Sequence, residues 1–275
     1  MKILGLVGSP RKEKGRTYEV VSRVLEGAAE KQAEVELIFL ADKNLEPCIH
    51  CDFDCFSELQ CKQNKGSKVF FEQIGEADGL VLGAPVYIWQ SNSLTISFIE
   101  KMRLRCGPWD RDIDNHRSAL GIAVAGGTGT GVFPALKSLY AFFNLWKFNP
   151  LKPLPVTRFN FNSALRTAEE NGKKMGNNKI KNISRTAEIM AYYDELKFLN
   201  YTRMDEFRWL AEKIIENLES NNQGSPKRLK KYKDQINLGN SLLEKDSRIE
   251  AVQEFMSVYK KSRKLWEEKK LSGKS

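Results

Sequence analysis

Four cysteines fall within 14 residues of the chain, in the pattern C-x-x-C-x-x-x-C-x-x-x-x-x-C. They are Cys48, Cys51, Cys55 and Cys61. In a chain that lacks the features of a secreted protein, such a group indicates metal or redox chemistry rather than a disulfide framework. Thiolates are soft ligands that select iron–sulfur clusters or zinc. Three interpretations follow from the spacing: a four-iron, four-sulfur cluster, a structural zinc, or redox-active thiols without a metal.

A second chemical motif is the segment GSPRKEKGRT, residues 8–17, which lies between a short apolar run and a helical pattern. Backbone N–H groups at a helix N-terminus lack partners within the helix, and the helix dipole favours an anion there. Ser9 and Thr17 add hydroxyls, and Arg11 and Arg16 add positive charge. The segment matches neither G-x-x-x-x-G-K-[ST] nor G-x-G-x-x-G, which weakens both commoner nucleotide-binding interpretations. It predicts a phosphate-binding loop, with an exposed turn carrying incidental basic residues as the alternative.

Two more segments have the composition of ligand-binding loops. One is GAPVYIWQSNS, residues 83–93, which overlaps the end of an apolar run and continues past it. The other is AGGTGTG, residues 125–131, which lies at the end of a second apolar run. Glycines allow the backbone to approach a flat ring closely.

Strand and helix patterns alternate along the first 160 residues, as is needed to position these loops. Apolar runs predict strands at Lys2–Gly8, Val35–Ala41, Gly79–Tyr87, Ser118–Gly127 and Leu154–Phe159. Helical spacing separates them at Thr17–Lys31, Val69–Ala77, Leu94–Leu104 and Pro134–Trp146. The third run is apolar throughout, which predicts a central strand. The βαβα rhythm predicts an α/β protein with a doubly wound, five-stranded parallel sheet. Ligands bind outside the carboxyl ends of the strands in such a sheet, where all three loops should lie.

The rest of the chain has no further strand pattern. Helices are predicted at Thr186–Leu199 and Arg203–Leu218, and Asn221–Ser225 is a polar break. Residues 236–270 are mostly helical in pattern and strongly charged. Phe207, Trp209 and Leu210 are candidate packing anchors, either at an interface between subunits or in the core of a helical cap.

The net charge of +9 is distributed unevenly. Residues 221–275 carry 14 Lys and Arg against 7 Asp and Glu, whereas residues 1–220 carry 30 against 28. We therefore expect a first domain, residues 1–220, with an inserted cysteine loop at 48–61, and a basic helical extension, residues 221–275. The extension has a solvated surface or one that steers an acidic redox partner. No nucleic-acid motif accompanies the charge, so no nucleic-acid partner is expected.

The sequence has no pattern typical of membrane insertion. No apolar run approaches the ~18 residues that a spanning helix requires, and the first residues do not form a signal peptide. We expect a cytoplasmic protein without a membrane partner. Cys106, far from the other cysteines, is expected to be a packing residue.

The three loops together resemble those of the NAD(P)H-dependent FMN reductase superfamily. The motif GSPRK-x-x-G-x-T follows the first strand, GAPVY the third and AGGTGTG the fourth, and the resemblance covers roughly residues 1–159. It implies a flavodoxin-like fold with bound FMN. It assigns the phosphate to Ser9, Arg11, Arg16 and Thr17, although relatives commonly carry asparagine in place of Arg16.

The resemblance also implies which residues contact the flavin ring: Pro85, Val86, Tyr87 and Ile88 after the third strand, and Gly126, Gly127, Thr128 and Gly129 after the fourth. Trp89 is less usual and packs either near the flavin or in a core or interface. Ser91 and Ser93 are candidates to cap the following helix.

The iron–sulfur flavoproteins within this superfamily carry a compact cysteine run after the second strand. Their usual pattern has two residues between the second and third cysteines, whereas this chain has three before Cys55. The resemblance nevertheless favours a four-iron, four-sulfur (4Fe-4S) cluster bound by all four cysteines.

The resemblance implies an FMN-dependent oxidoreductase that passes electrons from a ferredoxin-like or nicotinamide donor, NAD(P)H, to a small-molecule acceptor. It also implies a homodimer or homotetramer. No protein side chain is assigned as a general acid or base, since cofactors carry the chemistry. Two alternatives remain: an NAD(P)H-dependent FMN or quinone reductase without a cluster, and a flavodoxin-like carrier or binding module without turnover of its own.

Overall fold

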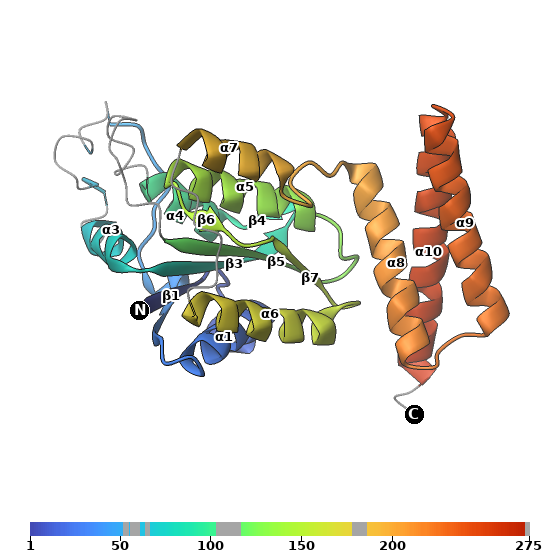
Figure 1. Ribbon diagram of the computed structural model, residues 1–275, viewed down its shortest axis with the longest axis horizontal. Coiled ribbons are helices and arrows are strands. Elements are labelled where there is room, and N and C mark those ends of the chain that lie inside the picture. The colour runs from blue at the N-terminus through green and yellow to red at the C-terminus, as the bar shows by residue number, and fades with distance from the viewer. Residues whose placement is uncertain (52–54, 56–60, 64–66, 103–116, 178–185, 273–275) are drawn as a thin grey trace. The chain divides into compact units, whose positions relative to one another are not determined.

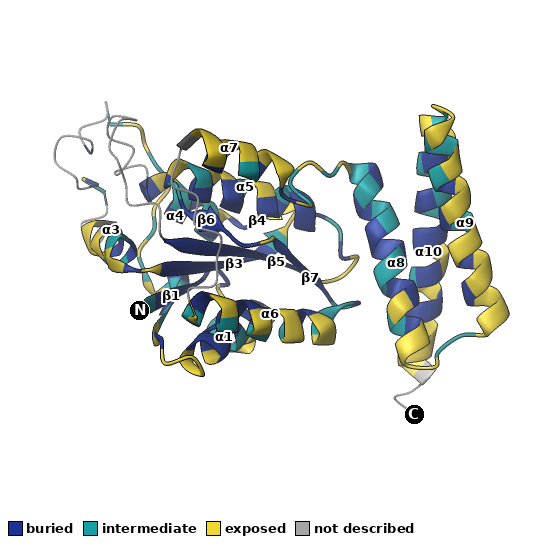
Figure 2. Ribbon diagram, in the orientation of Figure 1, coloured by how far each residue is buried: buried dark blue, intermediate teal, exposed yellow. Residues whose placement is uncertain are grey.

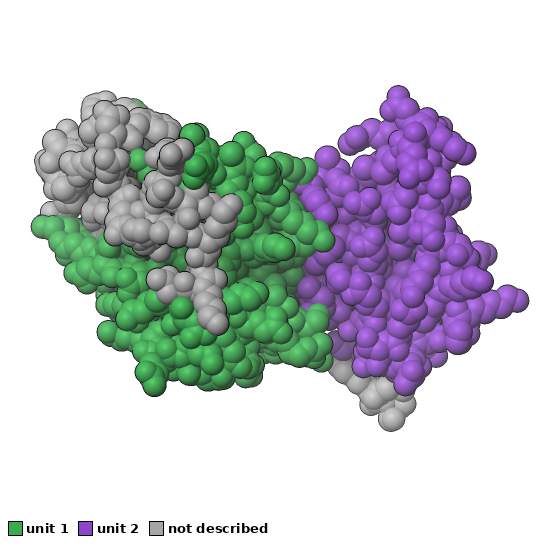
Figure 3. All heavy atoms as spheres, viewed as in Figure 1, with its two compact units in different colours: residues 1–126, 131–156, 161–200 green, residues 127–130, 157–160, 201–275 purple. Residues whose placement is uncertain are grey.

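The computed structural model describes the chain except for residues 52–54, 56–60, 64–66, 103–116, 178–185 and 273–275. The chain divides into two compact units (Figure 3). The first unit comprises residues 1–126, 131–156 and 161–200, and the second comprises residues 127–130, 157–160 and 201–275. None of the described helices combines the length and the apolar character needed to cross a membrane.

The first unit is built on a mostly parallel sheet in the order β2-β1-β3-β5-β6, with β7 also paired to β5 (Figure 1). Its strands are β1 (Lys2–Val7), β2 (Glu34–Phe39), β3 (Gly79–Tyr87), β4 (Gln90–Ser91), β5 (Ser118–Ala125), β6 (Asn149–Pro150) and β7 (Leu154–Thr157). This is the strand order of a flavodoxin-like sheet. It confirms the predicted α/β class and the central position of β3. The two-residue strands β4 and β6 were not predicted, because so short a segment has no periodicity.

Helices cover both faces of this sheet. They are α1 (Arg16–Ala29), α3 (Ser67–Glu76), α4 (Ser93–Lys101), α5 (Val132–Leu145), α6 (Phe161–Gly176) and α7 (Thr186–Glu195). Figure 1 shows α1 and α6 on one face and α4, α5 and α7 on the other. Strands β1, β3, β5 and β7 are almost entirely buried between these layers, whereas the edge strand β2 is only partly buried (Figure 2).

Helix α6 was missed by the sequence prediction. Most of its buried residues are small or polar, such as Ala164, Ala168 and Gly172, and Met175 is the one large apolar side chain among them. A Cβ atom at Gly172 would lie 1.9 Å from the carbonyl oxygen of Val24 in α1. The two helices therefore pack with their backbones in close approach, which requires glycine at this position.

The second unit is a bundle of three helices, α8 (Arg203–Ser220), α9 (Pro226–Glu244) and α10 (Arg248–Ser272), together with the short segments 127–130 and 157–160. Thr202 and Asp205 form a capping box at the start of α8, and Ser225 caps α9 ahead of Pro226. Trp209 and Leu210 are buried in this unit. Of the two predicted roles for these residues, the described structure therefore favours the core of a helical cap.

Candidate functional site

The predicted phosphate loop connects β1 to α1 through a short 3₁₀ turn, Lys12–Lys14. Gly15 is the N-cap of α1, and no side chain caps this helix. The backbone amides of Arg16 and Thr17 at its first turn are thus available to an outside acceptor. The Ser9 and Thr17 side chains are buried, and the Ser9 hydroxyl accepts a hydrogen bond of 3.2 Å from the Arg11 amide. These are the features of an anion-binding turn.

The two arginines of this loop are both exposed. The guanidinium carbon of Arg16 lies 4.7 Å from the centroid of the Phe161 ring in α6. This stacking restrains the side chain while the guanidinium N–H groups keep their capacity to bind phosphate oxygens. Lys12 forms an ion pair with Asp42 instead of joining the arginines. Arg11 and Arg16, the two predicted phosphate ligands, are thus exposed at this loop, as is Lys14.

Asn92 links the phosphate loop to the loop after β3, a role that the sequence analysis did not assign. Its Nδ2 donates to the Gly8 carbonyl oxygen at 2.9 Å, and its Oδ1 accepts from the Thr95 hydroxyl at 2.6 Å. Its backbone amide donates to the Pro85 carbonyl oxygen at 3.1 Å. Asn92 is also the N-cap residue of α4, whereas Ser91 ends β4 and its hydroxyl donates to the Ala135 carbonyl oxygen. The sequence signal that could have identified this role is an asparagine directly before a helical pattern.

The loop after β3 is a tight hairpin whose tip is apolar and exposed. Val86 pairs with Ser91 and Tyr87 with Gln90, which leaves Ile88 and Trp89 as the two turn residues. Their φ angles are 46° and 64°, the left-handed conformation that two-residue hairpins require. Tyr87, Ile88 and Trp89 are 47%, 92% and 56% exposed. Of the alternatives for Trp89, core packing is excluded.

The glycine loop after β5 begins beside this hairpin, because Pro85 of β3 is in register with Val124 of β5. Gly126 and Gly127 are exposed, and a Cβ atom at either position would meet no other atom within 4 Å. The space in front of these two residues is open, as a ring-binding backbone requires. Gly129, by contrast, is buried.

The sheet register brings the first two loops and the start of the third to one edge. Val7 of β1 is paired with Gly83 of β3, and the Gly8 amide donates to the Gly83 carbonyl oxygen at 2.8 Å. The phosphate loop, the hairpin and Gly126 thus all leave the sheet at the carboxyl ends of adjacent strands. This is the edge where doubly wound sheets bind ligands.

The four clustered cysteines line a single hollow in the first unit, together with Ile49, Gln63, Glu100 and Lys101. The empty space around them, open solvent included, is about 290 Å³. Cys55 and Cys61 are buried, and Cys48 and Cys51 are half-buried. The structure therefore brings together all four of the predicted ligands, including Cys55 with its unusual spacing. Cys106 lies outside the described residues.

Two residues at the end of α4 complete this hollow. Lys101 is only 2% exposed, and its Nζ donates to the Cys61 sulfur at 3.3 Å and to Gln63 Oε1 at 3.0 Å. The backbone amide of Cys48 donates to Glu100 Oε2 at 3.2 Å. Lys101 was not identified from the sequence, because a lysine near the end of an amphipathic helix normally points to solvent.

In the described part of the chain, no three His, Cys, Asp or Glu side chains are arranged to hold a single metal ion. A single-ion site such as structural zinc needs four ligands converging on one centre.

Comparisons with known proteins agree with this description. Residues 1–154 match the family model described as NADPH-dependent FMN reductase. An iron–sulfur flavoprotein of Methanocaldococcus jannaschii is 35% identical over 144 residues, which span 52% of this chain and 72% of that protein. A second iron–sulfur flavoprotein of this organism is 27% identical over 175 residues, which span 63% and 85%.

Two solved structures share the fold. RosB, determined with bound 8-demethyl-8-formylriboflavin-5′-phosphate, has a TM-score of 0.53 at 14% identity, covering 70% of this chain and 86% of that one. The azoreductase AzrA has a TM-score of 0.51 at 13% identity, covering 63% and 100%.

Proposed function

The chain belongs to the NADPH-dependent FMN reductase family, in its iron–sulfur flavoprotein branch, and we propose that it couples FMN to a 4Fe-4S cluster. It is a flavin-dependent oxidoreductase. In the proposed reaction it passes electrons from a ferredoxin-like or nicotinamide donor to a small-molecule acceptor. FMN exchanges a hydride or single electrons and a cluster only single electrons, so the pair connects one- and two-electron partners.

The phosphate loop supports the assignment of FMN. The uncapped first turn of α1 offers two backbone amides, with Arg11 and Arg16 beside them. We assign the phosphate to this turn and to the Ser9 and Thr17 hydroxyls. The ring is assigned to the backbone of residues 85–88 and 126–129, where the exposed Gly126 and Gly127 leave open space. In this proposal the protein binds and orients the cofactor and supplies no general acid or base.

The observation that carries the cluster assignment is the single hollow lined by Cys48, Cys51, Cys55 and Cys61. Four thiols around one space are the ligand set of a 4Fe-4S cluster. The Lys101 ammonium beside Cys61 would help to balance the negative charge of a thiolate-bound cluster, and the low dielectric around the two buried cysteines would strengthen that attraction.

The proposal includes assembly into a homodimer or homotetramer. The exposed apolar tip of the hairpin, Tyr87–Trp89, belongs to a loop assigned to the flavin ring, and its exposed side chains fit contact with a second copy of the chain. A cytoplasmic location belongs to the same proposal, because a reducing compartment keeps the cysteines available as ligands.

A second candidate is an NAD(P)H-dependent FMN or quinone reductase without a cluster. The observation that favours it is the match of residues 1–154 to the family model described as NADPH-dependent FMN reductase. In this case the four cysteines would remain thiols, and FMN would be the only redox cofactor.

Anaerobic purification followed by a visible spectrum, with iron and acid-labile sulfide assays on the same sample, separates the candidates. Flavin bands with broad charge-transfer absorption and about four irons per chain support the cluster. Flavin bands without iron, even after anaerobic reconstitution, leave the FMN reductase. Cys61→Ser should lower the iron content, whereas Cys106→Ser, the matched loss of a thiol outside the cluster motif, should not. Failure to take up FMN contradicts the central proposal.

A further inference from the structure

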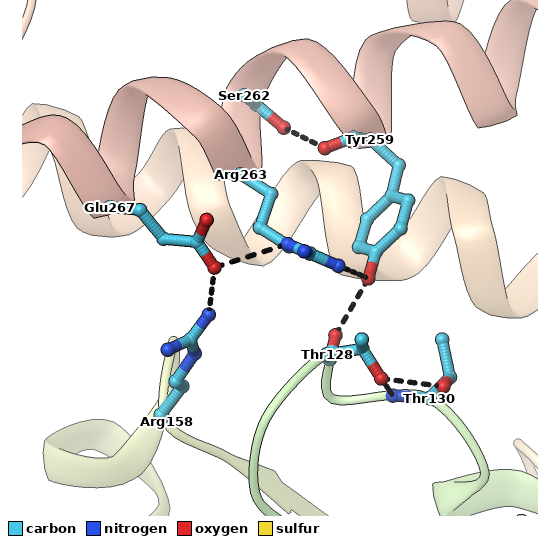
Figure 4. Close-up of polar contacts among 7 residues, drawn as sticks. All are labelled: Thr128, Thr130, Arg158, Tyr259, Ser262, Arg263 and Glu267. Atoms are coloured by element: carbon cyan, nitrogen blue, oxygen red, sulfur yellow. Dashed lines mark hydrogen bonds and ion pairs between the residues drawn. The ribbon is translucent and has the colours of Figure 1, made fainter.

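The second compact unit contains part of the glycine loop as well as the C-terminal helices. Tyr259 of α10 donates a hydrogen bond of 2.8 Å from its hydroxyl to the Thr128 carbonyl oxygen (Figure 4). Tyr259 is only 4% exposed, and its ring packs against the Phe207 ring of α8 at a centroid distance of 5.4 Å. A buried side chain 131 residues away in sequence thus holds the backbone of a loop assigned to the flavin.

This hydrogen bond sets the direction of one peptide group. The described chain has no cis peptide bond, so the Thr128 carbonyl and the Gly129 amide point in opposite directions. With the carbonyl facing α10, the Gly129 N–H faces away from that helix. No acceptor among the described residues takes a hydrogen bond from it. The amide is therefore a donor that no described acceptor uses, in a residue that is itself buried.

The loop needs such a restraint because its glycines have wide conformational freedom. Gly127 and Gly129 flank Thr128, and their φ angles are +43° and +80°. Packing supplies part of the restraint, since a Cβ atom at Gly129 would lie 2.9 Å from Leu210 Cδ2 and 3.1 Å from Phe159 Cε2. Packing does not select the direction of the 128–129 peptide, whereas a hydrogen bond to its carbonyl does.

A network of charged groups holds the Tyr259 hydroxyl in turn. Arg263 donates from Nη1 to the hydroxyl oxygen at 3.3 Å and from Nε to Glu267 Oε1 at 3.2 Å. Glu267 also pairs with Arg158, which lies in the second loop of this unit (Figure 4). Because the guanidinium can only donate, the hydroxyl must direct its own hydrogen to Thr128.

We infer that Tyr259 is a positioning residue for FMN binding, because it holds the 128–129 peptide so that the Gly129 amide is presented to the flavin. The C-terminal helical unit thereby contributes to flavin affinity. The inference rests on the proposed function, since it takes FMN as the ligand of this loop.

Tyr259→Phe tests the inference, because it removes one oxygen atom and keeps the ring packing. The matched control is Tyr232→Phe in α9, which also removes a buried hydroxyl of this unit, one that bonds the Lys261 carbonyl oxygen at 3.5 Å. FMN affinity of the apoprotein is measured by flavin fluorescence quenching. Hydrogen–deuterium exchange of the amides of residues 127–130 is measured without FMN.

We expect Tyr259→Phe to weaken FMN binding by about three- to tenfold, the equivalent of one neutral hydrogen bond, and to speed exchange in the loop. Tyr232→Phe should change neither. Equal FMN affinity in Tyr259→Phe and the wild type would overturn the inference, as would the same loss in both variants, which would reflect general destabilisation. A wild-type chain that takes up no FMN would instead overturn the proposed function, and the inference with it.

Discussion

The ammonium group of Lys101 donates a hydrogen bond of 3.3 Å to the sulfur of Cys61 from a side chain that is only 2% exposed. Burying a lysine is costly unless its charge is compensated. Its neighbours in the hollow include thiols, Gln63 and the Glu100 carboxylate, and a negatively charged thiolate group there would add to the compensation of its charge. Lys101 is thus a structural reason to expect an anionic cluster at this position.

Lys101→Met should therefore lower the reduction potential of the reconstituted cluster. The reduced cluster carries one more negative charge, and a cation with a hydrogen bond to sulfur stabilises it. We expect a shift on the order of tens of millivolts toward negative potential. Redox titration followed by electron paramagnetic resonance measures it. Lys68→Met, at an exposed lysine of α3, is the control, and an unchanged potential in Lys101→Met contradicts the prediction.

Asn92→Ala should destabilise the protein and weaken FMN binding together. The buried amide satisfies the Gly8 carbonyl oxygen and the Thr95 hydroxyl, and its loss leaves both without this partner. We expect about 1–3 kcal/mol less stability in urea denaturation. FMN affinity should fall because Gly8 starts the phosphate loop. The control is Ser93→Ala, one residue further along, which leaves these hydrogen bonds intact and should have little effect. Equal losses of stability and FMN affinity in both variants would show that Asn92 has no special role.

Ile88→Asn should stabilise the chain. A β-branched residue at a φ of 46° is strained, whereas asparagine tolerates the left-handed region. Ile88 is 92% exposed, so little packing is lost. We expect a gain of about 1 kcal/mol in the free energy of unfolding. Ile249→Asn replaces another exposed isoleucine, in a helix, and should be neutral or slightly destabilising. Loss of stability in Ile88→Asn would indicate that the tip is packed against a second copy of the chain.

Stability should fall at alkaline pH because of two buried tyrosines in the first unit. Burial raises the pKa of the Tyr140 phenol far above its ordinary value of about 10, and burial also raises the pKa of Tyr193. Above about pH 10 the unfolded chain loses these two protons, whereas the folded state keeps them. The free energy of unfolding therefore declines as pH rises above about 10. Each tyrosine contributes a slope of about 1.4 kcal/mol per pH unit.

Tyr140→Phe provides the check on this pH dependence. It should cost stability near neutral pH, because the hydroxyl donates to the Leu151 carbonyl oxygen at 2.7 Å. Its stability should then decline less steeply than that of the wild type above about pH 10. Urea denaturation across this pH range measures both effects. The exposed Tyr87→Phe should leave the slope unchanged, and an unchanged slope in Tyr140→Phe would contradict the assignment.

Elements with strong periodicity were predictable from the sequence. The apolar run Gly79–Tyr87 is strand β3 with the same bounds, because a strand buried on both faces must be apolar throughout. Helix α6 was missed although its buried residues, which include Ala164, Ala168 and Met175, recur at helical spacing. Most of them are small, because α6 lies in close backbone contact with α1 at Gly172, so its apolar face carries few large side chains.

The sequence by itself determined the chemistry that the chain can support. Three local patterns each indicate a class of ligand: the spacing of the cysteines, the phosphate loop and the glycine loop. None of these inferences needs a distance between side chains. Only the tertiary structure decided which distant groups act together: Lys101 with Cys61, Asn92 with Gly8, and Tyr259 with Thr128. These pairs are separated by 40 to 131 residues. No local pattern records them, because each hydrogen bond depends on how two elements pack and not on the residues that either one contains.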